Sequence, residues 1–397
     1  MPLTSSSHSS TKGRRDNGHL GRVVQLSSVH PAFEVRMFHK ESKALARAGY
    51  ELSVIVPHER SEVVDKVRII PVPKLQSRIA RMTVTVFRVW QEAVRANADI
   101  YHFHDPELIL VGLLLRAYGK KVIYDVREDL PRNILSKYYL PKWVRRPVAW
   151  FAEFVETAAS PAFSAIAATT PTIAKRFSSR NSKTVVIHNF PFVDELAPLP
   201  GKEWSDRSCS VAHIGYVMEQ RGIREMVEAM ELLPRDLRAR LILAGDFDPE
   251  LSDLRREIAS LQGWQRVDAL GPSDRRQVAA VLRNVCAGLL VYHPVPNYIR
   301  ALPTKMYEYM AAGIPVIASD FPLWREIIEE IRCGVLVDPL DPHSIARAVE
   351  FVLTHPAEAS AMGRRGREAV EKCFNWETEE KKLLQLYTEL SEPGYRF

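Results

Sequence analysis

Short apolar runs alternate with longer amphipathic runs along the whole chain. In the first half, the runs at 22–28, 52–57, 99–104 and 121–126 are rich in apolar residues, which is typical of buried parallel strands. Between the first two lies the helical pattern FHKESKALARAGY, which Gly49 is expected to end. The pattern therefore predicts strand–helix–strand units, from which parallel sheets covered by helices are built.

A second series of the same kind follows the Pro-rich segment PFVDELAPLPGKEW. Two successive series predict an α/β protein with two doubly wound, Rossmann-like domains that bind ligands at the carboxyl ends of their strands. We expect the first domain at 21–198, the second at 199–375, a final amphipathic helix at 376–397 and a polar, disordered tail at 1–20. The strand-like runs of the second series lie at 210–216, 239–245, 288–294, 314–320 and 334–339.

Composition and charge restrict the possible partners. No apolar run approaches the roughly 20 residues that span a bilayer. The four cysteines are far apart and form no C-x-x-C pair, so we expect a reducing, cytoplasmic setting without a disulfide framework. Residues 1–200 contain 29 Lys and Arg against 18 Asp and Glu, whereas the remainder contains 25 against 30. This basic first half predicts an anionic partner, and because no nucleic-acid motif is present we do not expect a nucleic acid.

The stretch RALPTKMYEYMAAGIPVIASD, at 300–320, predicts a short helix followed by a buried strand. Pro303 fits the first helical turn, so that the next three amides, at 304–306, would be free. Together with the helix dipole and the Lys305 ammonium they form a candidate anion site. Glu308 lies one turn further on and could accept hydrogen bonds from ribose hydroxyls. The alternative is that Lys305 and Glu308 form an ordinary surface ion pair.

A second candidate for anion binding is AHIGYVMEQRG, where a strand ends at Gly215 and Arg221 opens the next helix. A glycine here lets the backbone approach a pyrophosphate, and the arginine adds positive charge. The G-x-G-x-x-G pattern of dinucleotide-binding enzymes is absent. Asp246-x-Asp248 is similar to the metal-binding D-x-D of another class of sugar transferases, but its Asp-Pro ending favours a turn or a helix cap.

Polar residues also follow the strands of the first half. We expect them to line the acceptor side of a cleft. A His-x-His pair can bind a metal, but the sequence offers no obvious third ligand, so we expect no metal here. The residues are His30, Glu34 and Arg36 after the first strand, His102, His104 and Asp105 at the third, and Arg127, Glu128 and Asp129 after the fourth.

Residues 132–151 contain five basic residues, no acidic residue and several interleaved aromatic residues. Such a segment suits an anionic membrane interface, which predicts a protein held peripherally on the inner face of the plasma membrane. The alternative, a helical hairpin with a solvated basic face packed on its own domain, is nearly as well supported by the composition.

Five segments together resemble the family 4 retaining glycosyltransferases of the GT-B fold, over roughly residues 22–390. The similarity is greatest to the bacterial branch that builds capsule, O-antigen or exopolysaccharide units. The resemblance implies two facing Rossmann-like domains, with the last helix crossing back to the first, acceptor-binding domain. The segments are LPTKMYEYMAAGIPVIASDFP, HIGYVMEQRG, LGPSDRRQV, ADIYHFHDPEL and NWETEEKKLLQLY.

The resemblance also implies residue roles. Arg221 and Lys305 would bind the diphosphate of a UDP- or GDP-linked sugar, Glu308 the ribose, and the backbone near Gly271 the base. Thr304 and Arg300 would complete the donor site. Arg127 and Glu128 would take part in catalysis together with Arg221 and Lys305. A glycan or lipid-linked acceptor would be bound by His30, Arg36, His104 and Asp105. Neutralisation of the leaving diphosphate needs no metal and no cofactor, and retention implies front-face attack after domain closure.

Three positions depart from the family pattern. Tyr216 replaces an arginine after the glycine of the first phosphate-binding strand, Arg300 replaces a glutamate, and Arg127 replaces a histidine that lies beside the reacting carbon. Arg300 could bind the diphosphate in place of the missing arginine. These departures leave a second hypothesis open, a catalytically inactive GT-B subunit that binds a nucleotide sugar or a partner enzyme. A GT-B sugar epimerase fits the 300–320 stretch less well.

Overall fold

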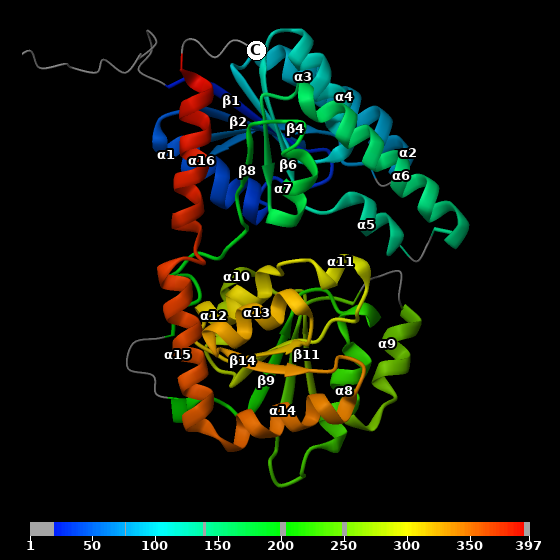
Figure 1. Cartoon of the computed structure of the whole chain (residues 1–397), viewed down its shortest axis with the longest axis vertical. Helices are drawn as coiled ribbons and strands as arrows, with labels where there is room; N and C mark the ends of the chain where they lie inside the picture. Colours follow the sequence, from blue (N-terminus) through cyan, green and yellow to red (C-terminus); the bar gives the residue numbers. More distant parts are fainter. Residues whose placement is uncertain (1–19, 76, 138–139, 199–203, 248–251, 393–397) are drawn as a thin grey trace, which may run out of the picture. The chain divides into compact units, whose positions relative to one another are not determined.

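The computed structural model describes residues 20–75, 77–137, 140–198, 204–247 and 252–392. The chain forms two compact units (Figure 1). The first comprises the described parts of Met1–Glu128, Phe151–Ile187 and Glu380–Phe397, and the second comprises those of Asp129–Trp150 and His188–Glu379. Three of the expectations concern residues outside the described ones: the polar tail except for Leu20, the domain junction after 198, and Asp248 of the D-x-D pattern.

The first unit is built on an eight-stranded sheet with the order β3-β4-β2-β1-β5-β6-β7-β8. All neighbouring strands are parallel except β3, which runs antiparallel to β4. The strands are β1 (Arg22–Leu26), β2 (Glu51–Pro57), β3 (Glu62–Val64), β4 (Val67–Val72), β5 (Ile100–Phe103), β6 (Lys121–Val126), β7 (Ala165–Ala168) and β8 (Thr184–Val186).

Helices join these strands and cover the sheet. As expected, the first crossover ends at Gly49, whose φ of 103° is the left-handed conformation that closes helices. The C-terminal helix α16 (Trp376–Ser391) packs on this unit, where the Tyr387 ring lies edge-on to Tyr50. The other helices are η1 (Val35–Ser42, a π-helix), α1 (Lys43–Ala48), α2 (Arg78–Ala80), η2 (Arg81–Thr85), α3 (Val86–Ala96), η3 (Pro106–Leu108), α4 (Ile109–Ala117), η4 (Ser160–Ala162), α7 (Pro171–Phe177) and the second half of α6 (Lys142–Ala159).

The second unit contains a fully parallel six-stranded sheet with the order β11-β10-β9-β12-β13-β14. Neighbouring residues on its strands face opposite hydrophobic cores: Leu289 belongs to one and Leu290 to the other. Burial on both faces explains why the sequence shows continuous apolar runs here. The strands are β9 (Ser210–Ile214), β10 (Arg240–Ala244), β11 (Val267–Gly271), β12 (Ala287–Leu290), β13 (Val316–Ser319) and β14 (Gly334–Val337).

The helices of the second unit lie on both faces of its sheet (Figure 1). Residues of α8 and α14 pack in one core, and residues of α10, α12 and α13 pack in the other. The helices are α5 (Leu130–Leu135), η5 (Trp204–Asp206), η6 (Glu219–Arg221), α8 (Ile223–Leu232), α9 (Ser252–Ala259), η8 (Gln262–Arg266), α10 (Arg275–Leu282), α11 (Pro296–Ile299), α12 (Thr304–Ala311), α13 (Pro322–Ile331), α14 (Pro342–Thr354) and α15 (Pro356–Lys372).

Both sheets confirm the predicted fold class of two Rossmann-like α/β domains. Five of the strands in the described residues were not among the predicted ones. β3 and β11 are edge strands whose residues are half-buried or exposed, so their sequences lack a buried apolar run. β4 pairs with β2, and β7 and β8 follow β6, so that these three extend the first sheet on both sides of the predicted strands.

Candidate functional site

The helix α12 is fixed against the carboxyl end of β9 by Tyr309. The Tyr309 ring packs on Gly288, where an added Cβ would lie 2.2 Å from a ring atom. Its hydroxyl donates to the Leu289 carbonyl at 3.3 Å and accepts from the Ile214 amide at 3.2 Å. One buried tyrosine therefore places the start of α12 beside the residue that follows β9, which is Gly215.

The two predicted anion-binding motifs meet at Gly215. A Cβ on this glycine would lie 3.3 Å from Nη1 of Arg221 and 3.5 Å from Cε of Lys305. The glycine has a φ of 110°, which side-chain-bearing residues rarely adopt. Arg221 lies over the ring of Tyr292, with 5.4 Å between the guanidinium carbon and the ring centroid. The geometry thus places two cations around one bare stretch of backbone, an arrangement suited to binding a diphosphate.

Glu308 is at the centre of a buried ion-pair network. It is 3% exposed, and its carboxylate lies 2.7 Å from Nζ of Lys305 and 2.5 Å from Nη1 of Arg275. Arg275 also forms a two-bond pair with Glu195, at 2.7 and 2.6 Å. Burial raises the pKa of Glu308, but Lys305 and Arg275 outweigh that effect and hold its pKa at about 2. Glu308 is therefore ionised at neutral pH and acts as a hydrogen-bond acceptor.

Two expectations for this helix need correction. The alternative, a Lys305–Glu308 surface pair, is right about the pair but wrong about its place, because the Glu308 side chain is only 4% exposed. Pro303 lies just before the first helical residue, and its carbonyl accepts the Met306 amide at 3.1 Å. The Met306 amide is therefore not free for an anion, because the first turn of the helix already uses it.

The remaining predicted donor residues lie around this centre. Thr304 begins α12, and its hydroxyl accepts from Nδ2 of Asn189 at 3.4 Å. Gly271 ends β11 with a φ of 73° and open space around its Cβ position, before the capping box that Asp274 forms at the start of α10. Arg300 is exposed at the C-terminal end of α11. Among the described residues, the Lys305–Glu308–Arg275 network does not include Arg300.

In the first unit, the residues after β1 and β5 form a hydrogen-bonded group around Asp105. Its carboxylate accepts from the Ser27 hydroxyl at 2.6 Å and from the Ser28 amide at 2.7 Å, and Nε2 of His30 lies 3.3 Å away. Burial and the nearby Arg127 lower the pKa of His30. Because 30% of its side chain is exposed, His30 is the member of this group that is accessible to a substrate.

Arg36 and His104, two expected acceptor residues, are buried instead. Arg36 is 1% exposed, and its guanidinium donates to both oxygens of Asp125 at 2.9 Å and to the Ile187 carbonyl at 3.0 Å. His104 is 3% exposed and Nδ1 lies 2.9 Å from the same Asp125. Both side chains have partners inside the unit, so the structure argues against the expected contacts with an acceptor.

Arg127, which stands where the family has a histidine, forms an ion pair with Glu34 at 3.1 Å. Burial raises the pKa of Glu34, but Arg127 together with the Met37 and Arg36 amides and His30 outweighs this effect and lowers the pKa to about 2. The neighbouring Glu128 is exposed. Thus Arg127, Glu128 and His30 are near the surface of the first unit, whereas Arg36, His104 and Asp105 are inside it.

Three residues of these networks were missed by the sequence reasoning: Arg275, Glu195 and Glu41. Glu41 is fully buried, and Oε1 lies 2.9 Å from Nε of Arg36. Burial raises its pKa to about 8. Arg275 and Glu195 pair with residues far away in the sequence, so no local spacing pointed to them, whereas Glu41 lies five residues after Arg36 in the same π-helix, η1. The signal that could have indicated the Arg36 network is Asp125, a charged residue inside a buried strand, which needs a partner.

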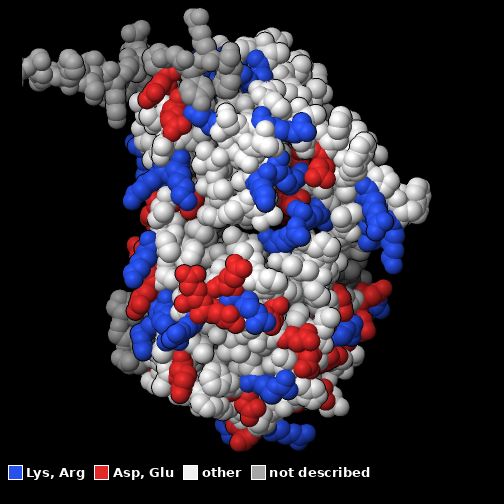
Figure 2. All heavy atoms as spheres, viewed as in Figure 1, with Lys and Arg blue, Asp and Glu red and all other residues white. Residues whose placement is uncertain are grey.

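The surface charge agrees with the uneven distribution along the chain. Figure 2 shows Lys and Arg gathered on the visible face of the first unit, while both signs of charge are mixed on the second. None of the helices in the described residues has the length and apolar character needed to span a bilayer.

Two family models match the chain. The model described as "Glycosyltransferase Family 4" matches residues 35–191, and the model described as "Glycosyl transferases group 1" matches residues 203–369. Each match falls within one of the two Rossmann-like sequence regions, and together they extend over most of the chain.

Similar proteins include the phosphatidyl-myo-inositol mannosyltransferase of Mycobacterium leprae, which is 24% identical over 94% of this chain and 93% of its own length. The glycogen synthase of Mycobacterium tuberculosis is 28% identical over 178 residues, so the chain spans only 41% of that relative. Among solved structures, the sucrose-phosphate synthase of Thermosynechococcus elongatus has a TM-score of 0.74 at 21% identity, covering 93% of this chain and 98% of that one. Anabaena HepE in complex with UDP-glucose has a TM-score of 0.70 at 15% identity, covering 93% and 100%. The chain belongs to the family 4 glycosyltransferases of the GT-B fold.

Proposed function

We propose that the chain transfers a hexosyl group, with retention, from a UDP- or GDP-linked sugar to a lipid-linked or growing cell-surface glycan. The observation that supports this proposal is the meeting of Arg221 and Lys305 at Gly215, with the ionised Glu308 one turn away. This arrangement offers two cations to a diphosphate and one carboxylate to a sugar hydroxyl, which is the chemistry of a nucleotide-diphosphate sugar.

In this proposal the two cations have the main catalytic role. Arg221 and Lys305 bind the diphosphate and stabilise the negative charge that develops on it as the sugar leaves. Because two side chains supply this charge, the transfer step does not require a metal ion. Lys305 has three donor hydrogens, so it can keep its 2.7 Å bond to Glu308 while donating to a phosphate oxygen.

Glu308 and the loop at Gly271 are proposed to bind the nucleoside. A carboxylate with a pKa of about 2 remains an acceptor throughout the neutral range and suits the two hydroxyls of a ribose. Gly271 leaves open space where a side chain would stand, which suits the flat face of a base. In the first unit, His30 and Glu128 are the exposed groups proposed to contact the acceptor.

The names of similar proteins agree with this class of reaction. HepE was crystallised in complex with UDP-glucose, and the Mycobacterium leprae relative is named as a mannosyltransferase acting on phosphatidyl-myo-inositol. These relatives support a nucleotide-sugar donor and a membrane-held acceptor for this chain as proposals.

A panel of UDP-, GDP-, ADP- and CMP-sugars tests the donor site by thermal stabilisation. One nucleotide is expected to raise the melting temperature, and Lys305→Ala and Glu308→Ala are each expected to abolish the rise. Lys372→Ala, which changes an exposed lysine at the end of α15, should respond like the wild type. Absence of a rise with every nucleotide would overturn the proposal.

We also propose that α6 binds an anionic membrane surface. Trp143, Trp150 and Phe154 recur at helical spacing and are 80%, 69% and 58% exposed. Phe151 is also 60% exposed, and Arg145 and Arg146 lie in the same helix. Exposed aromatic residues beside basic ones suit the boundary between headgroups and acyl chains. This observation favours the membrane alternative over a helix whose apolar face is packed on its own unit.

Cosedimentation with vesicles containing anionic lipid tests this surface. Reversing Arg145 and Arg146 to Glu should weaken binding at least about tenfold, since each basic residue near an anionic surface contributes about 1 kcal/mol. The matched control reverses Arg255 and Arg256, a consecutive pair on α9 in the second unit, and should leave binding unchanged. Equal binding by both variants would refute the role of α6.

The second candidate function is that of an inactive subunit that binds a nucleotide sugar or a partner enzyme. It is favoured by the Arg127–Glu34 ion pair, which occupies the family's histidine position with a permanently charged side chain. A nucleotide-dependent thermal shift without hydrolysis of the donor and without sugar transfer would favour this candidate. Hydrolysis or transfer that is lost in Lys305→Ala would exclude it.

A further inference from the structure

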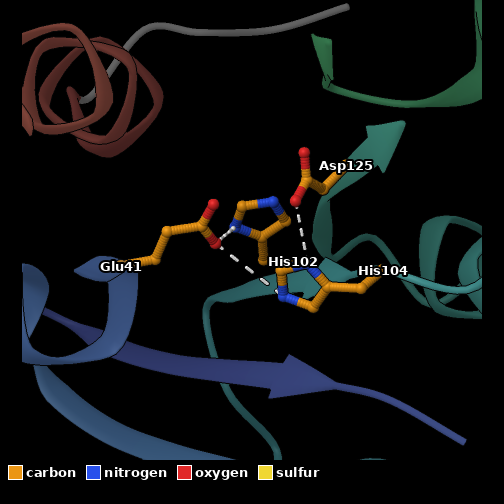
Figure 3. A group of neighbouring side chains, drawn as sticks. All are labelled: Glu41, His102, His104 and Asp125. Atoms are coloured by element: carbon orange, nitrogen blue, oxygen red, sulfur yellow. Dashed lines mark hydrogen bonds and ion pairs between the residues drawn. The ribbon is translucent and has the colours of Figure 1, made fainter. Parts of the chain in front are cut away.

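A group of four buried side chains in the first unit forms what we call the histidine–carboxylate cluster: Glu41, His102, His104 and Asp125 (Figure 3). Glu41 comes from η1, the two histidines from β5 and the residue after it, and Asp125 from β6. All four side chains are 0% exposed. Four potential metal ligands from three elements therefore face one another inside the unit.

The distances within the cluster suit a single ion. One potential ligand atom from each of the four side chains lies within 4.8 Å of the others. Oε2 of Glu41 is 3.9 Å from Nδ1 of His102 and 3.9 Å from Nε2 of His104. Two ligands of one zinc-type ion, each about 2.1 Å from it, can be at most about 4.2 Å apart. These two separations are therefore short enough for one ion, which His102 would bind through Nδ1 in place of its hydrogen bond to the Tyr387 hydroxyl.

Two nitrogen atoms in the cluster have no hydrogen-bond partner within the described part of the chain: Nε2 of His102 and Nε2 of His104. Leaving a buried polar atom without a partner costs about 1–3 kcal/mol. The other nitrogen of each ring is already held, His104 by Asp125 and His102 by the Tyr387 hydroxyl, both at 2.9 Å. His104 is thus oriented as metal-binding histidines typically are, with one nitrogen held by a neighbour and the other 3.9 Å from Oε2 of Glu41. In His102 the nitrogen that lies 3.9 Å from this oxygen is Nδ1, the one that also contacts Tyr387.

The charge balance also favours a cation. Arg36 contacts Oε1 of Glu41 and both oxygens of Asp125, and Arg127 lies 3.6 Å from Asp125 and 3.1 Å from Glu34. Two positive charges thus face the three carboxylates of Glu34, Glu41 and Asp125, so one negative charge is left over. Oε2 of Glu41 accepts from Nε2 of Gln25 at 3.4 Å and faces the imidazoles. Such a charge requires either a proton or a cation.

We propose that the histidine–carboxylate cluster binds one divalent transition-metal ion of the zinc class through Glu41, His102 and His104, with Asp125 orienting His104. Two imidazoles and a carboxylate favour this class over magnesium and calcium, which prefer oxygen ligands alone. Because the side chains are completely buried, the ion stabilises the fold of the first unit and does not contact a substrate. The proposal is independent of the proposed transfer reaction, whose cations are in the second unit.

Metal analysis of the full, tag-free chain tests this proposal. After incubation with zinc chloride and desalting, elemental analysis should find about one zinc per chain in the wild type and below about 0.1 in His104→Ala and Glu41→Gln. The matched control is His213→Asn, which changes an equally buried histidine of the second unit and should keep about one zinc. Cobalt substitution should give visible absorption bands in the wild type that are absent in Glu41→Gln.

The wild type alone provides a second measurement if the variants fail to fold. A strong chelator present during heating captures the ion as the chain opens, so the melting temperature should fall in chelator and rise again with added zinc. Folded wild type that binds no zinc and melts at the same temperature with and without chelator would overturn the proposal and leave a proton in the cluster. Zinc that persists in both Glu41→Gln and His104→Ala would overturn it too, because the ion would then lie elsewhere.

Discussion

Substituting Arg275 by alanine should destabilise the chain through Glu308. Arg275 joins Glu308 of α12 to Glu195, which lies before the first strand of the second unit. Once the guanidinium is removed, Glu308 keeps only the Lys305 partner while remaining 3% exposed. The buried carboxylate then keeps its full desolvation cost but loses part of the ionic attraction that offsets this cost.

The magnitude follows from the pKa of Glu308. A shift from 4.5 to about 2 corresponds to about 3 kcal/mol in favour of the ionised, folded form. Lys305 and Arg275 both cause this shift, so Arg275 accounts for roughly half of it. Its partly exposed pair with Glu195 adds less than about 1 kcal/mol. We therefore expect Arg275→Ala to lower the free energy of unfolding by about 2 kcal/mol.

Urea unfolding between pH 7 and pH 3.5 measures this effect. The folded pKa of Glu308 lies below its unfolded value, so its stabilising contribution is complete above about pH 4.5 and is lost as the pH falls toward 2. The difference between wild type and Arg275→Ala should therefore shrink as the pH falls below 4.5. Glu195→Gln, which leaves the Arg275–Glu308 bond in place, should cost less than about 1 kcal/mol.

Two results would refute this reasoning. If the difference were the same at pH 7 and pH 3.5, the ionised form of Glu308 would not be what Arg275 stabilises. If Glu195→Gln cost as much as Arg275→Ala, Arg275 would act mainly by attaching the segment around Glu195, and Glu308 would be secondary.

Four further substitutions test the geometry of the two units. Gly215→Ala should weaken nucleotide-sugar binding at least about tenfold in a titration, because a Cβ there enters the space between Arg221 and Lys305 in a strained backbone conformation. Gly245→Ala should lower the free energy of unfolding by more than about 2 kcal/mol, because its Cβ would lie 1.9 Å from the Gly215 carbonyl oxygen. Gly271→Ala has open space around the new Cβ, so it should lower the free energy of unfolding by only about 1 kcal/mol. Glu34→Gln should lower the free energy of unfolding by about 1 kcal/mol at pH 7, because the ion pair with Arg127 is lost. The difference from the wild type should vanish as the pH falls from 4.5 toward about 2, the folded pKa of Glu34.

The sequence predicted those parts of the site that have local signals. Lys305 and Glu308 are three residues apart on one helix, and Gly215 and Arg221 share one strand–helix turn, so spacing alone indicated both pairs. That the two motifs belong together followed from topology, because the carboxyl ends of parallel strands meet at one edge of a sheet. The structure adds the distances from the Cβ position of Gly215, which are 3.3 Å to Nη1 of Arg221 and 3.5 Å to Cε of Lys305.

The residues that the sequence did not indicate are joined over long separations. Arg275 lies 33 residues from Glu308 and 80 from Glu195, and Arg36 lies 89 from Asp125. Such pairs depend on which elements are neighbours in the fold, which local spacing does not reveal. Arg36 was expected to face an acceptor because it follows a strand, but the π-helix that begins at Val35 places it inside, against β6.

The departures from the family pattern affect donor binding and transfer differently. In the second unit, Arg221 and Lys305 meet at Gly215 although Tyr216 replaces an arginine, so two cations remain for the proposed diphosphate site. In the first unit, Arg127 introduces a guanidinium charge that is held by Glu34 at 3.1 Å. A side chain that cannot exchange a proton can still stabilise negative charge, which is the demand that a leaving diphosphate makes. Retaining transfer by front-face attack requires charge stabilisation more than a general base, so the arginine is compatible with the proposed activity. The measurement that distinguishes an active enzyme from an inactive subunit is therefore donor turnover, not donor binding.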